Sequence, residues 1–141
     1  MKINTKIRYG LRMVVAIAKS QRVINTNDLG KEMMVSPKYL RKLAGPLEKS
    51  GIIKSVQGIH GGYALNRDAD AINLKMILEA FGEKITLTDC LDDKNCRLID
   101  SCLTRRVWQN LETAIRQNFS SITVGDILAK RLAEPRTAFQ D

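Results

Sequence analysis

The chain has 141 residues, a hydrophobic share of 44% and a formal net charge of +8. This length suits one domain, or a small domain with an added helical part, and the apolar share argues against an intrinsically disordered chain. No apolar run approaches the roughly 18 residues of a membrane span, and the short run from Met13 to Ala18 indicates an amphipathic helix, not a targeting signal. We therefore expect a cytoplasmic protein with no membrane partner.

The positive charge is concentrated in the first half of the chain. Residues 1–66 hold 12 Lys and Arg against 3 Asp and Glu, a net charge of +9, whereas residues 67–141 hold 11 against 12, a net charge of −1. A basic half joined to a near-neutral half favours a polyanion as the partner of the first half and a different task for the second. We expect two parts that divide near residue 66.

The first predicted element is a helix that runs to about Ser20, with Asn4 or Thr5 as its cap. Gly10 inside this helix lowers its propensity and indicates close packing against a neighbouring element. The apolar residues of the helix recur with the helical period at Ile7, Leu11, Val14, Val15 and Ala18.

Two further helices are predicted with a tight turn between them. The second helix covers about residues 27–34 and is started by Asn25 or Thr26, and the third begins at once. Ser36 is a good cap for that third helix and Pro37 suits its first position. Two short helices in this arrangement, the second rich in Lys, Arg and Tyr, are typical of a helix-turn-helix.

The start of the third helix is the predicted reader of the major groove. Arg contacts guanine edges, whereas Lys, Ser and Tyr contact bases or phosphates. Gly45 and Pro46 are expected to kink or divide this helix, because proline removes a backbone donor. Leu40, Leu43 and Leu47 are expected to face the core. The candidate DNA contacts are Ser36, Lys38, Tyr39, Arg41 and Lys42.

A β-hairpin is predicted directly after these helices. Two strand-like runs, Ile52 to Val56 and Tyr63 to Leu65, flank the Gly-rich tip QGIHGG. A hairpin in this place is the wing of a winged helix, and its glycines let the backbone approach a groove. Gln57, His60 and Gly61 are the candidate DNA contacts of the tip. His60, the only histidine, is more typical of a DNA or solvent contact than of a metal ligand at this place.

The three cysteines of the chain follow a fourth predicted helix over residues 73–81. Cys90, Cys96 and Cys102 are separated by five residues each, in a polar segment read as a loop over about residues 89–103. Clustered thiols suit soft metal ions. In a reducing compartment, metal ligation or a redox switch is favoured over a structural disulfide framework.

A long amphipathic helix is predicted over about residues 103–119, and a last one over residues 124–132 with Thr123 as its cap. We expect the long helix to pair with that of a second copy, because a palindromic operator needs a two-fold reader. The alternative is that its apolar stripe packs within the chain. The stripe consists of Leu103, Val107, Trp108, Leu111, Ala114, Ile115 and Phe119. The fold class is therefore mainly α with a small β-wing, that is, a winged helix-turn-helix plus a C-terminal dimerisation helix.

The helix-turn-helix, the wing GIHGGYAL, the three evenly spaced cysteines and the helix start CLTRRVWQNL occur in one order. In that combination nearly the whole chain resembles the IscR/NsrR group of winged-helix regulators, the Rrf-type family. The resemblance implies a bacterial homodimer, in most cases a repressor and not an enzyme, that binds palindromic promoter DNA through residues 1–66. It also implies a [2Fe–2S] or [4Fe–4S] cluster on Cys90, Cys96 and Cys102, whose loss, nitrosylation or oxidation changes DNA binding.

The chain departs from the family pattern at the fourth cluster ligand. IscR-like members have a His three residues after the third cysteine, where this chain has Arg105, which cannot ligate. Some nitric-oxide sensors take an Asp from the partner's first helix, and the corresponding place here is near Arg8. The remaining candidates are a residue of the partner's N-terminus, an exogenous thiol or water, and Asp89, Asp92, Asp93 and Asp100.

Two further alternatives stay open. The cysteines could act as a thiol redox switch or bind zinc without a cluster, although three cysteines without a fourth strong ligand favour zinc less. IscR-like members have an acidic residue where Arg41 stands and Arg where Gln57 stands, so the operator sequence is not predicted. Iron–sulfur status, nitric oxide, oxidants and iron level all fit as the signal.

Overall fold

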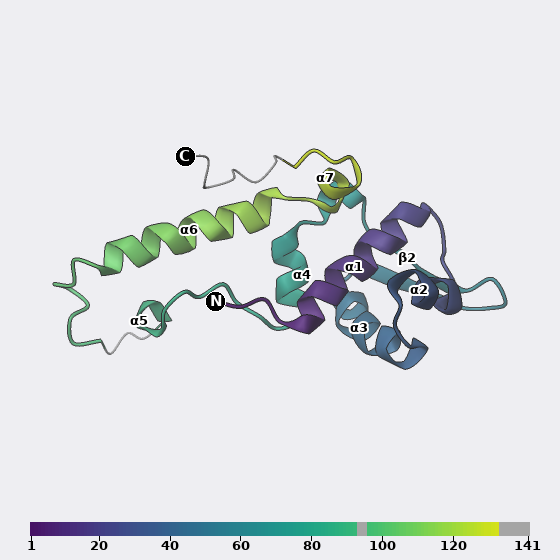
Figure 1. The fold of residues 1–141 in the computed structure, drawn as a ribbon, viewed down its shortest axis with the longest axis horizontal. Helices are drawn as coiled ribbons and strands as arrows, with labels where there is room; N and C mark the ends of the chain where they lie inside the picture. The colour runs from purple at the N-terminus through teal and green to yellow at the C-terminus, as the bar shows by residue number, and fades with distance from the viewer. Residues whose placement is uncertain (93–95, 133–141) are drawn as a thin grey trace, which may run out of the picture.

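The computed structural model describes residues 1–92 and 96–132 and is mainly helical with a small antiparallel sheet, as predicted (Figure 1). Residues 93–95 of the cysteine segment, which include the candidate ligand Asp93, lie outside the described residues. In chain order the elements are α1 Thr5–Ser20, α2 Thr26–Met33, α3 Pro37–Lys49, β1 Ile53–Val56, β2 Gly62–Leu65, the 3-10 turn η1 Ala69–Ala71, α4 Leu74–Ala80, α5 Asp89–Asp92, α6 Arg105–Ser121 and α7 Val124–Leu128.

Side-chain caps start the first three helices where the sequence predicts. Asn4 accepts a 3.0 Å hydrogen bond from the backbone N–H of Ile7 and begins α1. Asn25 and Ser36 cap α2 and α3 in the same way, and Pro37 occupies the first turn of α3. Such caps satisfy backbone donors that have no partner inside the helix. The helix-turn-helix is therefore set by local chemistry.

The main core lies where α1 crosses α2 and α3. Met13 and Ile17 of α1 are fully buried against the predicted core residues of α3. Those residues are Leu40, Leu43 and Leu47, and each is at most 1% exposed. Burying one such side chain contributes about 1.5–3 kcal/mol.

Gly10 lets α1 approach α4, which confirms its predicted close contact. A Cβ at Gly10 would overlap the ring of Phe81, directly after α4. Any larger residue at this position would force the Phe81 ring to move.

Two predicted helix boundaries differ from the structure: the division of the third helix at Pro46, which is the alternative to a kink there, and the end of the last helix at residue 132. α3 is not divided at Pro46 but continues to Lys49. Leu43 and Leu47 are buried on both sides of the proline, so packing holds the helix together despite the missing donor. α7 ends at Leu128 and not at residue 132, because Lys130 takes a left-handed backbone with φ of 53°.

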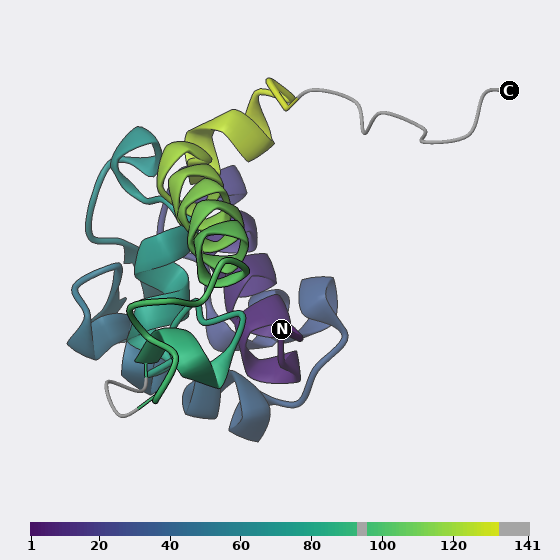
Figure 2. The ribbon, with the colours of Figure 1, turned by 90° about the vertical axis from the view of Figure 1, so that its left-hand side faces the viewer.

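The chain after the wing runs out from the core and returns to it. α4 packs on α1, and the linker to α5 leads to the far end of α6 (Figure 1). Figure 2 looks along α6, which lies beside α4. α7 then rejoins the main core through the fully buried Val124. None of the described helices is long and apolar enough to cross a membrane.

A second, smaller core fixes the C-terminal half of α6. Ile115 and Phe119 of α6 pack on the buried residues Ile7, Leu78 and Ile85. The other half of α6 projects beyond this contact (Figure 1). The apolar stripe is thus divided between a part packed within the chain and a part that is not.

Candidate DNA interface and cysteine site

The start of α3 presents a polar, basic surface. The exposed side chains are those of Ser36, Lys38, Arg41 and Lys42. Among the described residues, no acidic group lies within 4 Å of the three cations in this set. Arg and Lys side chains in this state are available to bases and phosphates. Four of the five candidate contacts on α3 are therefore presented to solvent.

Tyr39 of α3 is only half-exposed, because its ring packs against α1. The Tyr39 and Tyr9 rings meet edge to face, with centroids 5.8 Å apart and an interplanar angle of 83°. The Arg12 guanidinium lies over the Tyr9 ring at 5.1 Å from its centroid. Such contacts orient rings and cations. Tyr39 therefore connects the start of α3 to the scaffold as well as bordering the polar surface.

The wing is an antiparallel hairpin, and the start of β2, next to the wing tip, is joined to the α1–α2 turn. Ile24 and Tyr63 exchange two backbone hydrogen bonds of 2.9 Å each. Gly62 has a φ of +152°, and a Cβ there would overlap the carbonyl oxygen of Ile24. The glycine is therefore needed for this close approach. At the tip, Gln57 and His60 are exposed and Gly61 is half-exposed.

The three cysteines are free and half-buried. The segment is not a simple loop, because Cys90 lies in the short helix α5 and turns follow Cys96. The hydroxyl of Thr88 lies 3.1 Å from the Cys90 sulfur, and that of Thr104 lies 3.3 Å from the Cys102 sulfur. Local hydrogen bonding to threonine therefore gives this segment structure that its polar composition does not predict.

The environment of Cys102 favours its thiolate. The Thr104 hydroxyl, followed by the backbone N–H of Arg105, lowers the pKa of the Cys102 thiol. Both donors stabilise the negative charge at the start of α6.

Three thiols are suitable donors for an iron–sulfur cluster, but their placement does not match one. In residues 1–92 and 96–132, no three His, Cys, Asp or Glu side chains converge on a point that could hold a metal ion. Of the carboxylates considered as a fourth ligand, Asp92 accepts a hydrogen bond of 3.2 Å from Thr86. The chemistry of the donor set fits a cluster, whereas its described geometry does not.

Arg105 stands where a fourth ligand would be expected and connects two elements. Its Nη1 donates a 2.7 Å hydrogen bond to the carbonyl oxygen of Cys90. The first turn of α6 thus holds α5.

Sequence reasoning missed a second connection, made by Glu112 and Arg116 of α6. Glu112 accepts a 3.1 Å hydrogen bond from the backbone N–H of Leu87, and Arg116 donates one of 2.8 Å to the carbonyl oxygen of Ile85. The two side chains also form an ion pair at 2.8 Å. Their spacing of four residues is a visible signal for that pair, whereas their partners in the linker are not visible in the sequence.

The projecting half of α6 and the turn just before it, which holds Leu103, expose large apolar side chains. Leu103 is 92% exposed, Val107 52% and Leu111 47%, and Trp108 is also exposed. Exposed apolar side chains arranged in one row mark a surface for a partner.

Comparisons with known proteins agree with this arrangement. Residues 3–130 match the model of the family described as "Rrf2: Iron-dependent Transcriptional regulator". The chain is 33% identical to the protein rrf2 of Nitratidesulfovibrio vulgaris over 98% of this chain and 94% of that protein. It is 31% identical to the HTH-type transcriptional regulator IscR of Vibrio campbellii, over 91% and 77% of the two chains.

A solved structure gives the same fold. CymR, the global cysteine regulator of B. subtilis, superposes with a TM-score of 0.79 at 27% identity and covers 94% of this chain and 99% of its own. These similarities confirm the winged-helix fold and the resemblance to the Rrf-type family. The chain belongs to the Rrf2 family and is a DNA-binding transcriptional regulator, not an enzyme.

Proposed function

We propose that this regulator binds a palindromic promoter as a homodimer, acts as a repressor, and changes its DNA affinity through Cys90, Cys96 and Cys102. The observation that supports DNA reading most directly is the capped start of α3, which exposes Lys38, Arg41 and Lys42. It lies in the half of the chain with a net charge of +9. The DNA-binding part comprises residues 1–66, and its contacts are the candidate residues of α3 and the wing tip.

Dimerisation is supported by the projecting half of α6. Its exposed Val107, Trp108 and Leu111, together with Leu103 just before the helix, would be covered by the same residues of a second copy. Pairing of the two α6 helices across a two-fold axis would fix the distance between the two α3 helices, as a palindromic site requires. The helix dimer is thus part of the proposed function.

An iron–sulfur cluster is the first candidate for the sensor. The family description names iron, and three cysteines provide thiolates in the spacing that the resemblance implies. When bound, a cluster of this kind would carry redox and nitric-oxide chemistry. Cys90, Cys96 and Cys102 would be its ligands, after a movement that brings the three sulfurs together. That movement would alter the connections of Arg105 and Glu112 to the rest of the segment.

A thiol switch, or a zinc site, is the second candidate. The thiol switch is favoured by the hydrogen bond of Thr104 to Cys102 and by the described geometry, in which the sulfurs do not converge. A zinc site, like a cluster, would need a movement that brings the three sulfurs together. The similarity to CymR, which is named a cysteine regulator, agrees with this alternative.

Anaerobic purification with a visible spectrum and assays of iron, acid-labile sulfide and zinc separates the candidates. A cluster predicts brown protein with iron and sulfide, and single Cys→Ala substitutions at positions 90, 96 and 102 should each lose the colour. Ser101→Ala, beside Cys102, is the matched control and should keep it. Colourless protein after attempted reconstitution would reject the cluster, and zinc without sulfide would favour the second candidate.

DNA reading is tested on duplexes that the protein selects from a random library. The selected sites should be palindromic. Arg41→Gln should reduce discrimination at one base position per half-site by about 1–3 kcal/mol, whereas a phosphate contact such as Lys42 should weaken binding to all sequences alike when changed to Gln. Selection of sites without two-fold symmetry would contradict the dimeric reader.

A further inference from the structure

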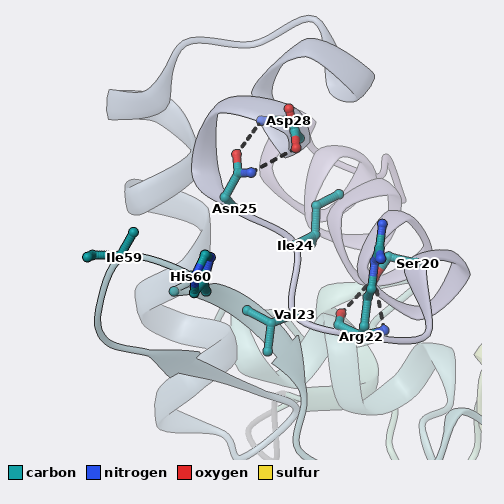
Figure 3. Close-up of a pocket in the computed structure, with 9 residues that line it drawn as sticks. Ser20, Arg22, Val23, Ile24, Asn25, Asp28, Ile59 and His60 are labelled. Atoms are coloured by element: carbon teal, nitrogen blue, oxygen red, sulfur yellow. Dashed lines mark hydrogen bonds between the residues drawn. The ribbon is translucent and has the colours of Figure 1, made fainter.

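Two hollows lie on either side of Arg22, in the turn between α1 and α2. The first has a volume of about 380 Å³ and lies between this turn and the wing tip, with Ile59 and His60 in its opposite wall (Figure 3). The second has a volume of about 350 Å³ and lies between the end of α1 and the sheet, where Lys54 of β1 lines it. Arg22 is part of the wall of both hollows.

The walls of these hollows are held in place before any ligand binds. The backbone hydrogen bonds between Ile24 and Tyr63 join the turn to the wing. The Ser20 hydroxyl donates a 2.8 Å hydrogen bond to the carbonyl oxygen of Arg22 and accepts one from its N–H at 3.4 Å. Figure 3 shows Ser20 beside Arg22, with Val23 and Ile24 between Arg22 and His60. The position of the Arg22 backbone is thus fixed relative to the wing.

Cationic groups predominate around the two hollows. Arg22 and Lys54 are exposed, and within the described residues neither has an acidic group at 4 Å or less. Asp28 is the one acid in the described lining of the first hollow, and its carboxylate accepts a 2.8 Å hydrogen bond from the Asn25 amide. The described lining of the second hollow contains no acid. A surface with these groups suits a monoanionic phosphate ester.

We propose that the sugar–phosphate backbone of bound DNA passes over Arg22, so that Arg22 and Lys54 each contact a phosphate beside the wing. This proposal rests on the DNA binding proposed above and extends the interface from α3 and the wing tip to the α1–α2 turn and β1. Such contacts add affinity and fix the position of the duplex without reading its sequence. The guanidinium of Arg22 can donate two parallel hydrogen bonds to one phosphate, and Lys54 acts as a point charge.

The salt dependence of binding to a library-selected duplex tests the proposal. Each phosphate contact contributes about 0.9 to the slope of log K against log salt concentration. Arg22→Gln and Lys54→Gln should each lower that slope by about 0.9. Each variant would then lose about three- to fourfold less affinity than the unchanged protein between roughly 50 and 200 mM salt. Arg106 lies in the first turn of α6, and α6 projects away from the wing (Figure 1). Arg106→Gln therefore removes an equal charge elsewhere and should keep the slope.

A duplex with one neutral methylphosphonate identifies the phosphate. Neutralising the phosphate that Arg22 contacts should weaken binding of the unchanged protein and leave the affinity of Arg22→Gln unaltered. If the neutral group lowers the DNA affinity of both proteins equally, wherever it is placed in the duplex, the assignment to Arg22 is overturned.

The remaining outcomes separate the proposal from the function on which it rests. If the unchanged protein binds DNA and both variants keep its slope, the backbone path is wrong and the DNA reader stands. If Arg106→Gln lowers the slope as much, general charge explains the effect and the path is wrong. If inorganic phosphate shifts the Arg22 side-chain resonances while the DNA slope is unaltered in Arg22→Gln, the site takes free phosphate and not DNA. If no duplex is bound, the proposed function fails together with this inference.

Discussion

The guanidinium of Arg105 donates a 2.7 Å hydrogen bond to the carbonyl oxygen of Cys90, across fifteen residues of sequence. The side chain that cannot serve as a metal ligand therefore holds the first cysteine against the start of α6. This contact predicts that α5, with Cys90, keeps a defined position against the start of α6 without any bound group.

Arg105→Gln should release α5. Because the hydrogen bond to the Cys90 carbonyl is lost or weakened, we expect faster alkylation of Cys90 in the metal-free protein, measured for each cysteine by peptide mass spectrometry. Arg106→Gln, one residue further, is the matched control. Equal alkylation rates of Cys90 in the two variants would show that Arg105 does not hold this segment.

Val107→Glu and Leu111→Glu should convert the proposed dimer to a monomer. Both side chains are about half-exposed in the chain, so a charge there costs little folding stability but is buried without a partner at the helix interface. The mass from light scattering should halve and the affinity for a palindromic duplex should fall. Gln117→Glu adds the same charge outside the stripe and should stay dimeric. A dimeric mass for both stripe variants would locate the interface elsewhere.

Gly10→Ala should destabilise the fold although alanine is the better helix former. Overlap of the new methyl group with Phe81 should cost about 1–3 kcal/mol, which exceeds the propensity gain of up to about 1 kcal/mol. Urea denaturation measures the net effect. Adding Phe81→Leu to Gly10→Ala should restore part of the lost free energy of unfolding. If the double variant instead loses the sum of the two single-variant losses, the close contact is not the cause.

Stability should depend on Asp126 in a pH-dependent way. The backbone N–H and then the side chain of Thr123 lower the pKa of Asp126 below its ordinary value of 3.8. A carboxyl group with a depressed pKa stabilises the fold above its unfolded-state pKa, and this contribution is lost as the pH falls through the lower folded-state pKa. The stability difference between the unchanged protein and Asp126→Asn, from urea midpoints, should therefore shrink below pH 3.8. Thr123→Ala should make this loss of stability with falling pH smaller. If the stability difference between the unchanged protein and Asp126→Asn is the same from pH 6 to pH 3, Asp126 does not contribute a pH-dependent stabilisation.

Met34→Asn should stabilise the turn between α2 and α3. Met34 has a φ of 53° and is 84% exposed, so its side chain contributes little packing at an unfavourable backbone conformation. The left-handed conformation costs an ordinary residue roughly 1–2 kcal/mol, and Asn tolerates it better. We expect a gain of about 0.5–1 kcal/mol in thermal or urea unfolding. Met34→Ala keeps the backbone strain and is the control. If it raises the free energy of unfolding as much as Met34→Asn does, removal of the exposed Met side chain, and not relief of the strain, explains the effect.

Features that depend on neighbouring residues could be predicted from the sequence. The caps Asn4, Asn25 and Ser36 are short-range signals, and α1, α2 and α3 begin where those signals stand. The wing follows from the pattern of two β-rich runs around a Gly-rich tip. The order of these parts along the chain then carries the family resemblance.

Features that depend on distant residues could not be predicted. Gly10 signals a close neighbour but does not identify Phe81, which is 71 positions away in the sequence. The sequence shows Arg105 only as a residue that cannot ligate, since nothing in a linear sequence points from its guanidinium to the Cys90 carbonyl. Pro46 does not divide α3, because the burial of Leu43 and Leu47 outweighs the loss of one backbone donor.

The pair Glu112 and Arg116 fixes the linker before the cysteines to a single turn of α6. The backbone at Ile85 and Leu87 is thereby held opposite that turn of the helix. Slippage of the helix along the linker would break both hydrogen bonds and the ion pair together. A deformation of the cysteine segment that keeps both hydrogen bonds would therefore tilt or rotate α6 as a whole and would not shift it along its axis.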